Sequence, residues 1–336
     1  MHFAFSEDQF LFRDTVRDFL ANESPPEQVR AAWENDTGRI PGLWGKLAEM
    51  GVVGLTAPES AGGLGMDEID LVLLLEEAGR AALPEPLVEH TAIAIPTLRA
   101  HGGARGEAWL EKAAAGEALI GVGICGPYVL YGEQADVLLL AHGEELHLVE
   151  RDDVTLTAQR SVDYSRRLSS VGWTPAAGTL LVSGVEAAQA VVDADDRGAL
   201  AAAAQCVGIA QQLIDVTVDY VGQREQFGKV VGSYQAVKHQ LANALLAVEF
   251  ARPRVYVASY AIANSTPHRT REVAMAKAVA SDAVDLAART ALQCHGAIGY
   301  TFEYDLHLWM KRGWALAAAF GDASHHRARV AVELGL

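Results

Sequence analysis

Hydrophobic residues recur at helical spacing through both ends of the chain. This pattern is the sequence feature that most restricts the possible folds of the chain. Ser6 and Gln9 fit an S-x-x-Q capping box at the start of a helix on which Val16 and Leu20 share one face. Similar apolar stripes occupy residues 71–78, 209–220, 237–248 and 273–287. Short strand-like runs, separated by turn residues, occupy 118–125, 137–141, 145–149, 154–157 and 179–182. The sequence therefore predicts a mainly α fold with a small β domain in the middle.

The chain is long enough for more than one packed substructure. At 336 residues it exceeds what a single hydrophobic core usually supports, so we expect three regions. They are an N-terminal helical domain over 1–117, a shortened β domain over 118–190 and a C-terminal helical bundle over 191–336. The last region is expected to begin near Val191, with Asp193, Asp195 and Asp196 forming a solvated helix start.

Composition and charge exclude several classes of function. Half of the residues are hydrophobic and 21% are charged, as in a globular protein. The chain has 27 Lys and Arg against 43 Asp and Glu, and its net charge of −16 disfavours binding to nucleic acid or to an anionic membrane. We expect no export signal, no membrane span, and a cytoplasmic location in which Cys125, Cys206 and Cys294 stay reduced. The histidines show no metal-ligand spacing, so no metal site is expected.

The segment from Arg224 to Gly228 carries the clearest functional signal. An arginine guanidinium can bind two phosphate oxygens in one plane, Gln226 adds an amide, and Phe227 offers a flat apolar face. Gly228 lets the backbone come close to a ligand. Taken alone, such a run is more often a turn at a helix end with a surface arginine.

A second candidate is the loop Gln293-Cys294-His295-Gly296-Ala297-Ile298-Gly299-Tyr300, which ends an alanine-rich helical stripe. Its two glycines fit a helix C-cap and a tight turn, and they also fit a bare backbone lying against a pyrophosphate. Another glycine-rich run, Gly62-Gly63-Leu64-Gly65, has no βαβ pattern around it. A Rossmann-type site is therefore rejected.

Taken together and in this order, the segments resemble the acyl-CoA dehydrogenase family. The run Arg224 to Gly228, with the downstream pair Tyr234-Gln235, is similar to the family's Arg-x-Gln-Phe-Gly segment and its aromatic-Gln pair. The loop Gln293 to Tyr300 is similar to the family's Gln-x-x-Gly-Gly-x-Gly-aromatic loop. Residues 5–9 and 47–80 resemble its N-terminal helical domain, so the resemblance spans both helical regions.

The resemblance implies an N-terminal helical domain, a middle β domain and a C-terminal four-helix bundle. It also implies oxidation of an acyl-CoA to its 2,3-enoyl-CoA, in which a Glu takes the α proton and FAD takes hydride from the β carbon. In such dimers the Arg segment and the Gln-Gly loop hold the nucleotide end of an FAD whose ring lies mainly in a neighbouring subunit. The implied contacts are Arg224, Gln226, Phe227, Tyr234, Gln235, Gln293 and Gly296. The implied electron acceptor is an electron-transfer flavoprotein.

The chain departs from the family pattern where the chemistry would take place. Ungapped counting puts the family's two alternative base positions at Phe320 and Gly198, and neither side chain can accept a proton. Asp322 and Asp196 lie two residues away, which leaves a displaced base open. The stretch 121–128 lacks the family's Thr-Glu and Ser-Asp residues that would contact the flavin ring.

These departures lead to one preferred hypothesis. The chain is expected to be a non-catalytic subunit of a heteromeric, α2β2-type acyl-CoA dehydrogenase, resembling bacterial enzymes that shorten steroid side chains. Its partner would be a homologous catalytic subunit that supplies the base and the ring pocket for the acyl-CoA substrate. Two alternatives stay open: a complete homomeric enzyme with Asp196 or Asp322 as base, and a flavin-free scaffold or thioester-binding protein.

Overall fold

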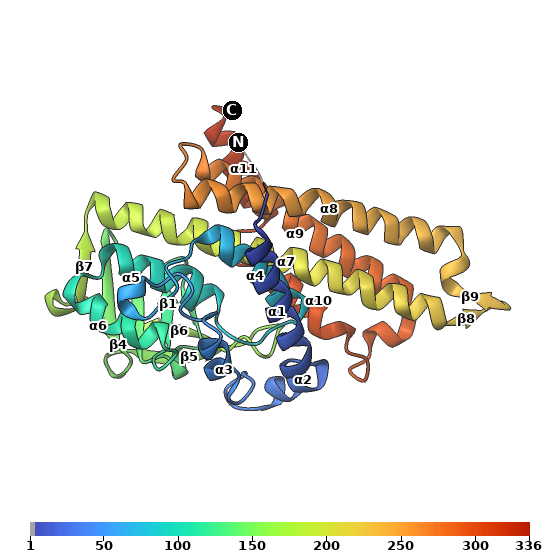
Figure 1. The fold of residues 1–336 in the computed structure, drawn as a ribbon, viewed down its shortest axis with the longest axis horizontal. Helices are drawn as coiled ribbons and strands as arrows, with labels where there is room; N and C mark the ends of the chain where they lie inside the picture. Colours follow the sequence, from blue (N-terminus) through green and yellow to red (C-terminus); the bar gives the residue numbers. More distant parts are fainter. Residues whose placement is uncertain (1–3) are drawn as a thin grey trace. The chain divides into compact units, whose positions relative to one another are not determined.

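The computed structural model describes residues 4–336, which form two compact units. The first unit contains residues 4–30, 72–83 and 202–336, and the second contains 31–71 and 84–201. Three helices, α2 (Pro26–Glu34), α4 (Glu68–Arg80) and α7 (Val185–Gln223), have residues in both units. The chain is mainly helical with a small strand region, as predicted (Figure 1). The division into 1–117, 118–190 and 191–336 stays a prediction.

The first unit is built from helices. It begins with α1 (Glu7–Glu23), where Ser6 Oγ accepts from the Gln9 amide at 3.2 Å and the Gln9 side chain accepts from the Ser6 amide at 2.8 Å. The predicted capping box is thus confirmed. The other elements are α2 (Pro26–Glu34, shared with the second unit), η6 (Val231–Ser233), α8 (Gln235–Ala263), α9 (Arg269–His295), η7 (Gly296–Tyr300), α10 (Leu306–Ala318) and α11 (Ala323–Glu333).

Small side chains allow the long helices of this unit to pack closely. The buried face of α9 is dominated by alanine, including Ala276, Ala280, Ala283 and Ala287, and α9 packs along α8. Figure 1 shows these two helices side by side. By length and composition α7 could cross a membrane, but 78% of its most apolar 18-residue stretch is buried inside the protein. Burial in the protein core therefore accounts for the apolar character of α7.

The second unit holds both larger sheets. One sheet has the strand order β1-β3-β4-β7 and the other has the order β2-β6-β5. Their bounds are β1 (Ile120–Gly123), β2 (Tyr128–Leu130), β3 (Val137–His142), β4 (Glu145–Glu150), β5 (Thr155–Gln159), β6 (Leu168–Gly172) and β7 (Leu180–Ser183). β1 and β3 are parallel, while all other pairs in the two sheets are antiparallel.

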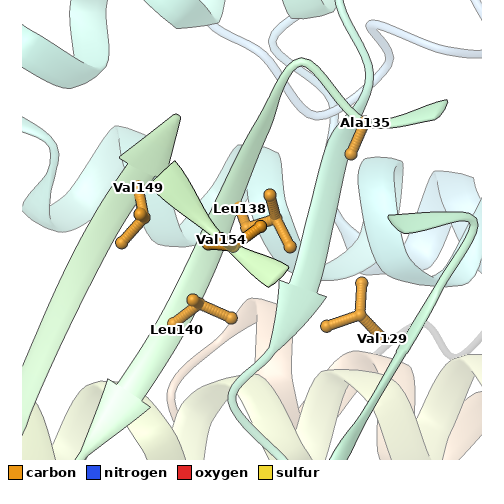
Figure 2. Packing of buried hydrophobic residues seen from close by; sticks show 6 residues of the cluster. All are labelled: Val129, Ala135, Leu138, Leu140, Val149 and Val154. Atoms are coloured by element: carbon orange, nitrogen blue, oxygen red, sulfur yellow. The ribbon is translucent and has the colours of Figure 1, made fainter. Parts of the chain in front are cut away.

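A compact apolar cluster holds this β region together. Figure 2 shows its buried members, which come from several strands and the segments between them: Val129, Ala135, Leu138, Leu140, Val149 and Val154. Leu156, Val171 and Trp173 pack against the cluster and are partly buried. Trp173 thus contributes to the core, in line with a structural role. The helical elements of the second unit are α3 (Leu43–Glu49), η1 (Glu59–Ala61), η2 (Val88–Ala94), α5 (Ile95–His101), α6 (Gly103–Ala114), η3 (Gly132–Gln134), η4 (Arg151–Asp153) and η5 (Ala177–Thr179).

The start of α7 corrects one expectation. The helix begins at Val185 and not near Val191, because Ala187 and Ala190 already form a buried face of small residues there. The expected solvated start at Asp193, Asp195 and Asp196 is therefore wrong: these residues lie inside the helix, and Asp196 is only 1% exposed.

Candidate functional site

The segment after α7 forms a small hairpin. β8 (Glu225–Gln226) pairs antiparallel with β9 (Lys229–Val230), and Figure 1 shows the hairpin where α7 ends and α8 begins. The two turn residues, Phe227 (φ 55°) and Gly228 (φ 79°), are both left-handed, as a two-residue type I′ turn requires. Glycine adopts this conformation freely, whereas phenylalanine does so at a cost. The turn presents the Phe227 ring to solvent, where it is 93% exposed.

Tyr234 stabilises the hairpin. Its hydroxyl donates to the Gln226 carbonyl at 3.1 Å, and the Lys229 ammonium lies 4.2 Å from the centre of its ring. The Val231 amide also donates to the Arg224 carbonyl at 2.7 Å. These contacts stabilise the hairpin conformation. Tyr234 therefore contributes to the candidate site indirectly, by holding the hairpin backbone in place.

The polar side chains of the two predicted segments are available to a ligand. Arg224, Gln226 and Gln293 are all exposed. Within residues 4–336, neither the Arg224 guanidinium nor the Gln293 amide has a hydrogen-bond or ion-pair partner, whereas Gln226 donates to the neighbouring Glu225 carbonyl. Gln235 is exposed at the start of α8 and lies 3.4 Å from the His239 ring. An unpaired guanidinium and an exposed aromatic ring on one short segment suit an anionic, aromatic ligand such as a nucleotide.

The second segment changes direction at Gly296. This residue has φ 66° and ψ −139°, a conformation almost restricted to glycine, and its amide donates to the Leu292 carbonyl to close α9. A Cβ atom on Gly296 would meet nothing within 4 Å, so its backbone faces open space. Gly296 is therefore both the C-cap of α9 and a residue whose backbone is accessible.

In the structure, the helix ends that carry the two segments contact each other. The rings of Tyr220 and His295 stack with centroids 4.3 Å apart and planes 18° from parallel. Arg224 follows Tyr220 by one helical turn, and its amide donates to the Tyr220 carbonyl at 2.9 Å. Gln293 and Gly296 flank His295 in the sequence. No sequence pattern predicts this contact, although His295 lies within the loop Gln293 to Tyr300.

The residues near the first base position have structural partners. Phe320 is left-handed at φ 54°, and its carbonyl accepts from His326 Nε2 at 2.7 Å. Asp322 caps α11, because its carboxylate accepts from the His325 amide at 2.8 Å, and this hydrogen bond lowers the pKa of Asp322. A carboxylate with a lowered pKa is a poor proton acceptor. At the second position, Gly198 lies inside α7 beside the buried Asp196.

A cavity of about 270 Å³ in the first unit is a separate candidate, lined by Arg13, Arg17, Glu76, Glu77, Arg80, Gln211, Arg252 and Tyr256. Its charged groups already pair with one another. Arg17 Nε lies 2.9 Å from Glu77, Arg252 Nε lies 2.9 Å from Glu76, and Arg80 reaches Asp215 at 2.8 Å. We interpret the charged side chains that line the cavity as an ion-pair network that joins α1, α4, α7 and α8. Residues 4–336 contain no group of three or more His, Cys, Asp or Glu placed to hold a metal ion.

Comparison with known proteins gives the family. The profile of the acyl-CoA dehydrogenase N-terminal domain matches residues 6–117, and the profile of the C-terminal domain matches residues 184–335. The chain is 36% identical to "Acyl-CoA dehydrogenase IpdE2" of Mycolicibacterium smegmatis over 98% of its own length and 99% of that protein.

Solved structures share the fold. The ChsE4-ChsE5 complex from Mycobacterium tuberculosis has a TM-score of 0.91 at 23% identity, covering 100% of this chain and 99% of that chain. A variant described as the Tcur3481-Tcur3483 steroid ACAD has a TM-score of 0.88 at 23% identity, covering 98% of each chain. The chain therefore belongs to the acyl-CoA dehydrogenase family, whose members are FAD-dependent flavoproteins.

Proposed function

We propose that this chain is a subunit of a heteromeric FAD-dependent acyl-CoA dehydrogenase that contributes the nucleotide-end contacts of FAD to a homologous catalytic partner. The observation that carries the proposal is the exposed hairpin with its unpaired Arg224. In a protein of net charge −16, an arginine with no carboxylate partner among the described residues favours an anionic ligand. The exposure of Phe227 adds an aromatic face, and the open space at Gly296 lets a ligand approach the backbone.

The residues on these two segments fit the nucleotide end of FAD. Arg224 and Gln293 would bind phosphate oxygens, Phe227 would pack on an aromatic base, and the Gly296 backbone would lie against the pyrophosphate. Gln226 would add an amide contact, while Tyr234 and Gln235 would hold the hairpin and the start of α8. When bound, FAD accepts the hydride that leaves the β carbon of an acyl-CoA.

A partner chain is favoured by exposed side chains on α8 and α9, the helices that follow the hairpin and precede the loop in the sequence. Long apolar side chains remain exposed on α8, including Leu246 (55%) and Phe250 (74%), and on α9, including Leu286 (39%). Exposed apolar groups of this size commonly mark a protein interface. We propose that a homologous catalytic subunit covers them in an α2β2-type assembly; two of the structures whose fold this chain shares are likewise named for a pair of chains.

The chain's own base positions favour catalysis by the partner. Phe320 and Gly198 cannot accept a proton, and Asp322 is engaged as a helix cap. The proposed substrate class is an acyl-CoA with a steroid-derived side chain, which follows from the steroid enzyme among the structural relatives. An electron-transfer flavoprotein is the proposed acceptor. In the second candidate, a homomeric enzyme, Asp196 would be the base, because it is a buried carboxylate two residues from Gly198.

Co-expression with a longer homologue tests the proposal. The co-purified complex is expected to be yellow and active, while this chain alone is expected to bind no flavin. In the complex, Arg224→Ala should lower the flavin content. The matched control is Arg160→Ala, which removes another exposed arginine without a partner among the described residues. A yellow, active homomer would contradict the heteromeric assignment, and unchanged flavin content in Arg224→Ala would contradict the assigned contacts.

A further inference from the structure

Three aromatic side chains meet between the two candidate nucleotide segments. Tyr220 lies near the end of α7, His295 is the last residue of α9, and Tyr304 lies between η7 and α10. Their ring centroids are 4.3 Å apart for Tyr220–His295, 5.0 Å for His295–Tyr304 and 5.9 Å for Tyr220–Tyr304. His295 is buried, and the two tyrosines are partly exposed. The cluster therefore lies at the surface end of the helices and not within the apolar core.

Hydrogen bonds fix the orientation of the His295 ring. Its Nδ1 lies 2.8 Å from the Ala291 carbonyl, which can only accept, so Nδ1 carries the proton. Its Nε2 lies 3.2 Å from the Tyr304 hydroxyl, which therefore donates to it. Burial lowers the pKa of His295 and so favours this neutral form. The two hydrogen bonds hold the ring in one orientation.

The ring is placed where it can couple the two segments. Tyr220, on one face of His295, is one helical turn before Arg224. His295 itself is two residues after Gln293 and directly before Gly296. The Tyr220 hydroxyl also donates to the His295 carbonyl at 3.5 Å, so the side chain and the backbone of His295 both contact the end of α7. A shift of His295 would move the hairpin and the loop relative to each other.

We propose that His295 is a positioning residue for the nucleotide end of FAD, holding Arg224 and the Gln293–Gly296 loop at the spacing that one ligand needs. The inference depends on the proposed function, because it assigns both segments to the same ligand. Displacing a positioned binding group by about 1 Å can cost on the order of a hundredfold in the process it supports. Loosening the stack of the two rings should likewise weaken binding of the nucleotide end.

The test compares FAD with FMN on the intact heteromeric complex, with each dissociation constant measured by flavin fluorescence. FMN lacks the adenylate half, so contacts to the nucleotide end raise the affinity for FAD over FMN. His295→Ala is expected to lower this FAD/FMN preference on the order of tenfold, since the two segments lose their spacer. His295→Phe keeps a ring stacked on Tyr220 but loses the acceptor of the Tyr304 hydroxyl, so it should recover the preference only to the level of Tyr304→Phe. Tyr304→Phe removes only the hydroxyl and should give an intermediate loss.

A matched control separates positioning from general damage. Trp309 is a buried aromatic residue of the same unit, and its Nε1 donates to the Arg80 carbonyl at 2.7 Å. Trp309→Phe should lower the thermal midpoint and leave the FAD/FMN preference unchanged. If the His295 and Tyr304 variants also leave the preference unchanged while Arg224→Ala lowers it, the positioning role is wrong and the proposed function stands. If Arg224→Ala leaves the preference unchanged, the proposed function fails and this inference fails with it.

Discussion

Gly79 of α4 and Gly208 of α7 lie at one helix crossing, where each presses against the backbone of the other helix. A Cβ atom on Gly79 would stand 2.2 Å from the Gln205 carbonyl oxygen, and a Cβ atom on Gly208 would stand 1.9 Å from the Glu76 carbonyl oxygen. Real Cβ atoms essentially never come closer than 3.0 Å to such an atom. The first unit therefore depends on direct backbone contact between these two helices.

Gly208→Ala is expected to destabilise the protein. Alanine gains about 1 kcal/mol of helix propensity over glycine, but the overpacked crossing should cost about 3 kcal/mol, so the clash dominates. Urea unfolding would measure the loss. Gly222→Ala is the matched control in the same helix, because a Cβ there meets nothing within 4 Å and should be neutral or slightly stabilising. Equal stability in the two variants would show that the crossing tolerates a methyl group.

The sequence predicts the fold class because amphipathic stripes and alternating strands carry their own periods. It does not reveal elements that lack a period. The segment Val88–Ala94 is buried on every side, so no apolar stripe marks it as helical. Similarly, Ala187 and Ala190 are too weakly hydrophobic to show where α7 begins.

The candidate site could be found only in part from the sequence. Arg224 and Gln293 stand out by residue type and spacing, and both are exposed in the structure. The stack of Tyr220 on His295 joins residues 75 positions apart, and no local pattern encodes such a contact. The support that Tyr234 gives to the hairpin likewise appears only once the turn is folded.

Two buried groups of the second unit should give opposite pH dependences. Burial lowers the pKa of His90 from 6.5 to about 4, and its ring bridges the Ala113 carbonyl and the Ile120 amide. Between these pH values the unfolded chain holds the extra proton, so the His90 contribution to stability falls as the pH falls. Burial raises the pKa of Glu85 from 4.5 to about 7 despite its pairing with Arg39. Here the folded state holds the extra proton, so the Glu85 contribution falls as the pH rises.

In the native protein, the pH dependences of the His90 and Glu85 contributions to the free energy of unfolding should cancel between about pH 4.5 and 6.5. Each contribution changes by about 1.4 kcal/mol per pH unit, in opposite directions. Glu85→Gln should therefore lose stability on acidification, whereas His90→Leu, though less stable at neutral pH, should gain stability on acidification. Urea midpoints measured across this range would show the two slopes. Parallel curves for both variants would mean that other groups control the pH response.

Lys277 is a buried cation that should be essential for the end of α10. Its side chain is 0% exposed and donates to Ser281 Oγ at 3.0 Å, the Ala317 carbonyl at 2.9 Å and the Gly321 carbonyl at 3.0 Å. Lys277→Met removes the donor to the Gly321 carbonyl and leaves the Ala317 carbonyl only its long hydrogen bond from Ser281 Oγ, so it should cost about 3 kcal/mol in the free energy of unfolding. Lys238→Met, which changes an exposed lysine of α8, should cost little. A Met variant as stable as the native protein would show that water satisfies the carbonyls.

Asp322 is expected to act as a helix cap and not as a displaced base. Asparagine caps helices as well as aspartate does, so Asp322→Asn should keep both stability and turnover per flavin in the heteromeric complex. Asp322→Ala removes the acceptor for the His325 amide and should cost about 1 kcal/mol of stability, again without loss of turnover per flavin. Stopped-flow reduction of the flavin by an acyl-CoA would measure the reductive half-reaction, which requires removal of the α proton. Because neither an amide nor a methyl group can take a proton, slow reduction in both variants would make Asp322 the base and the chain catalytic.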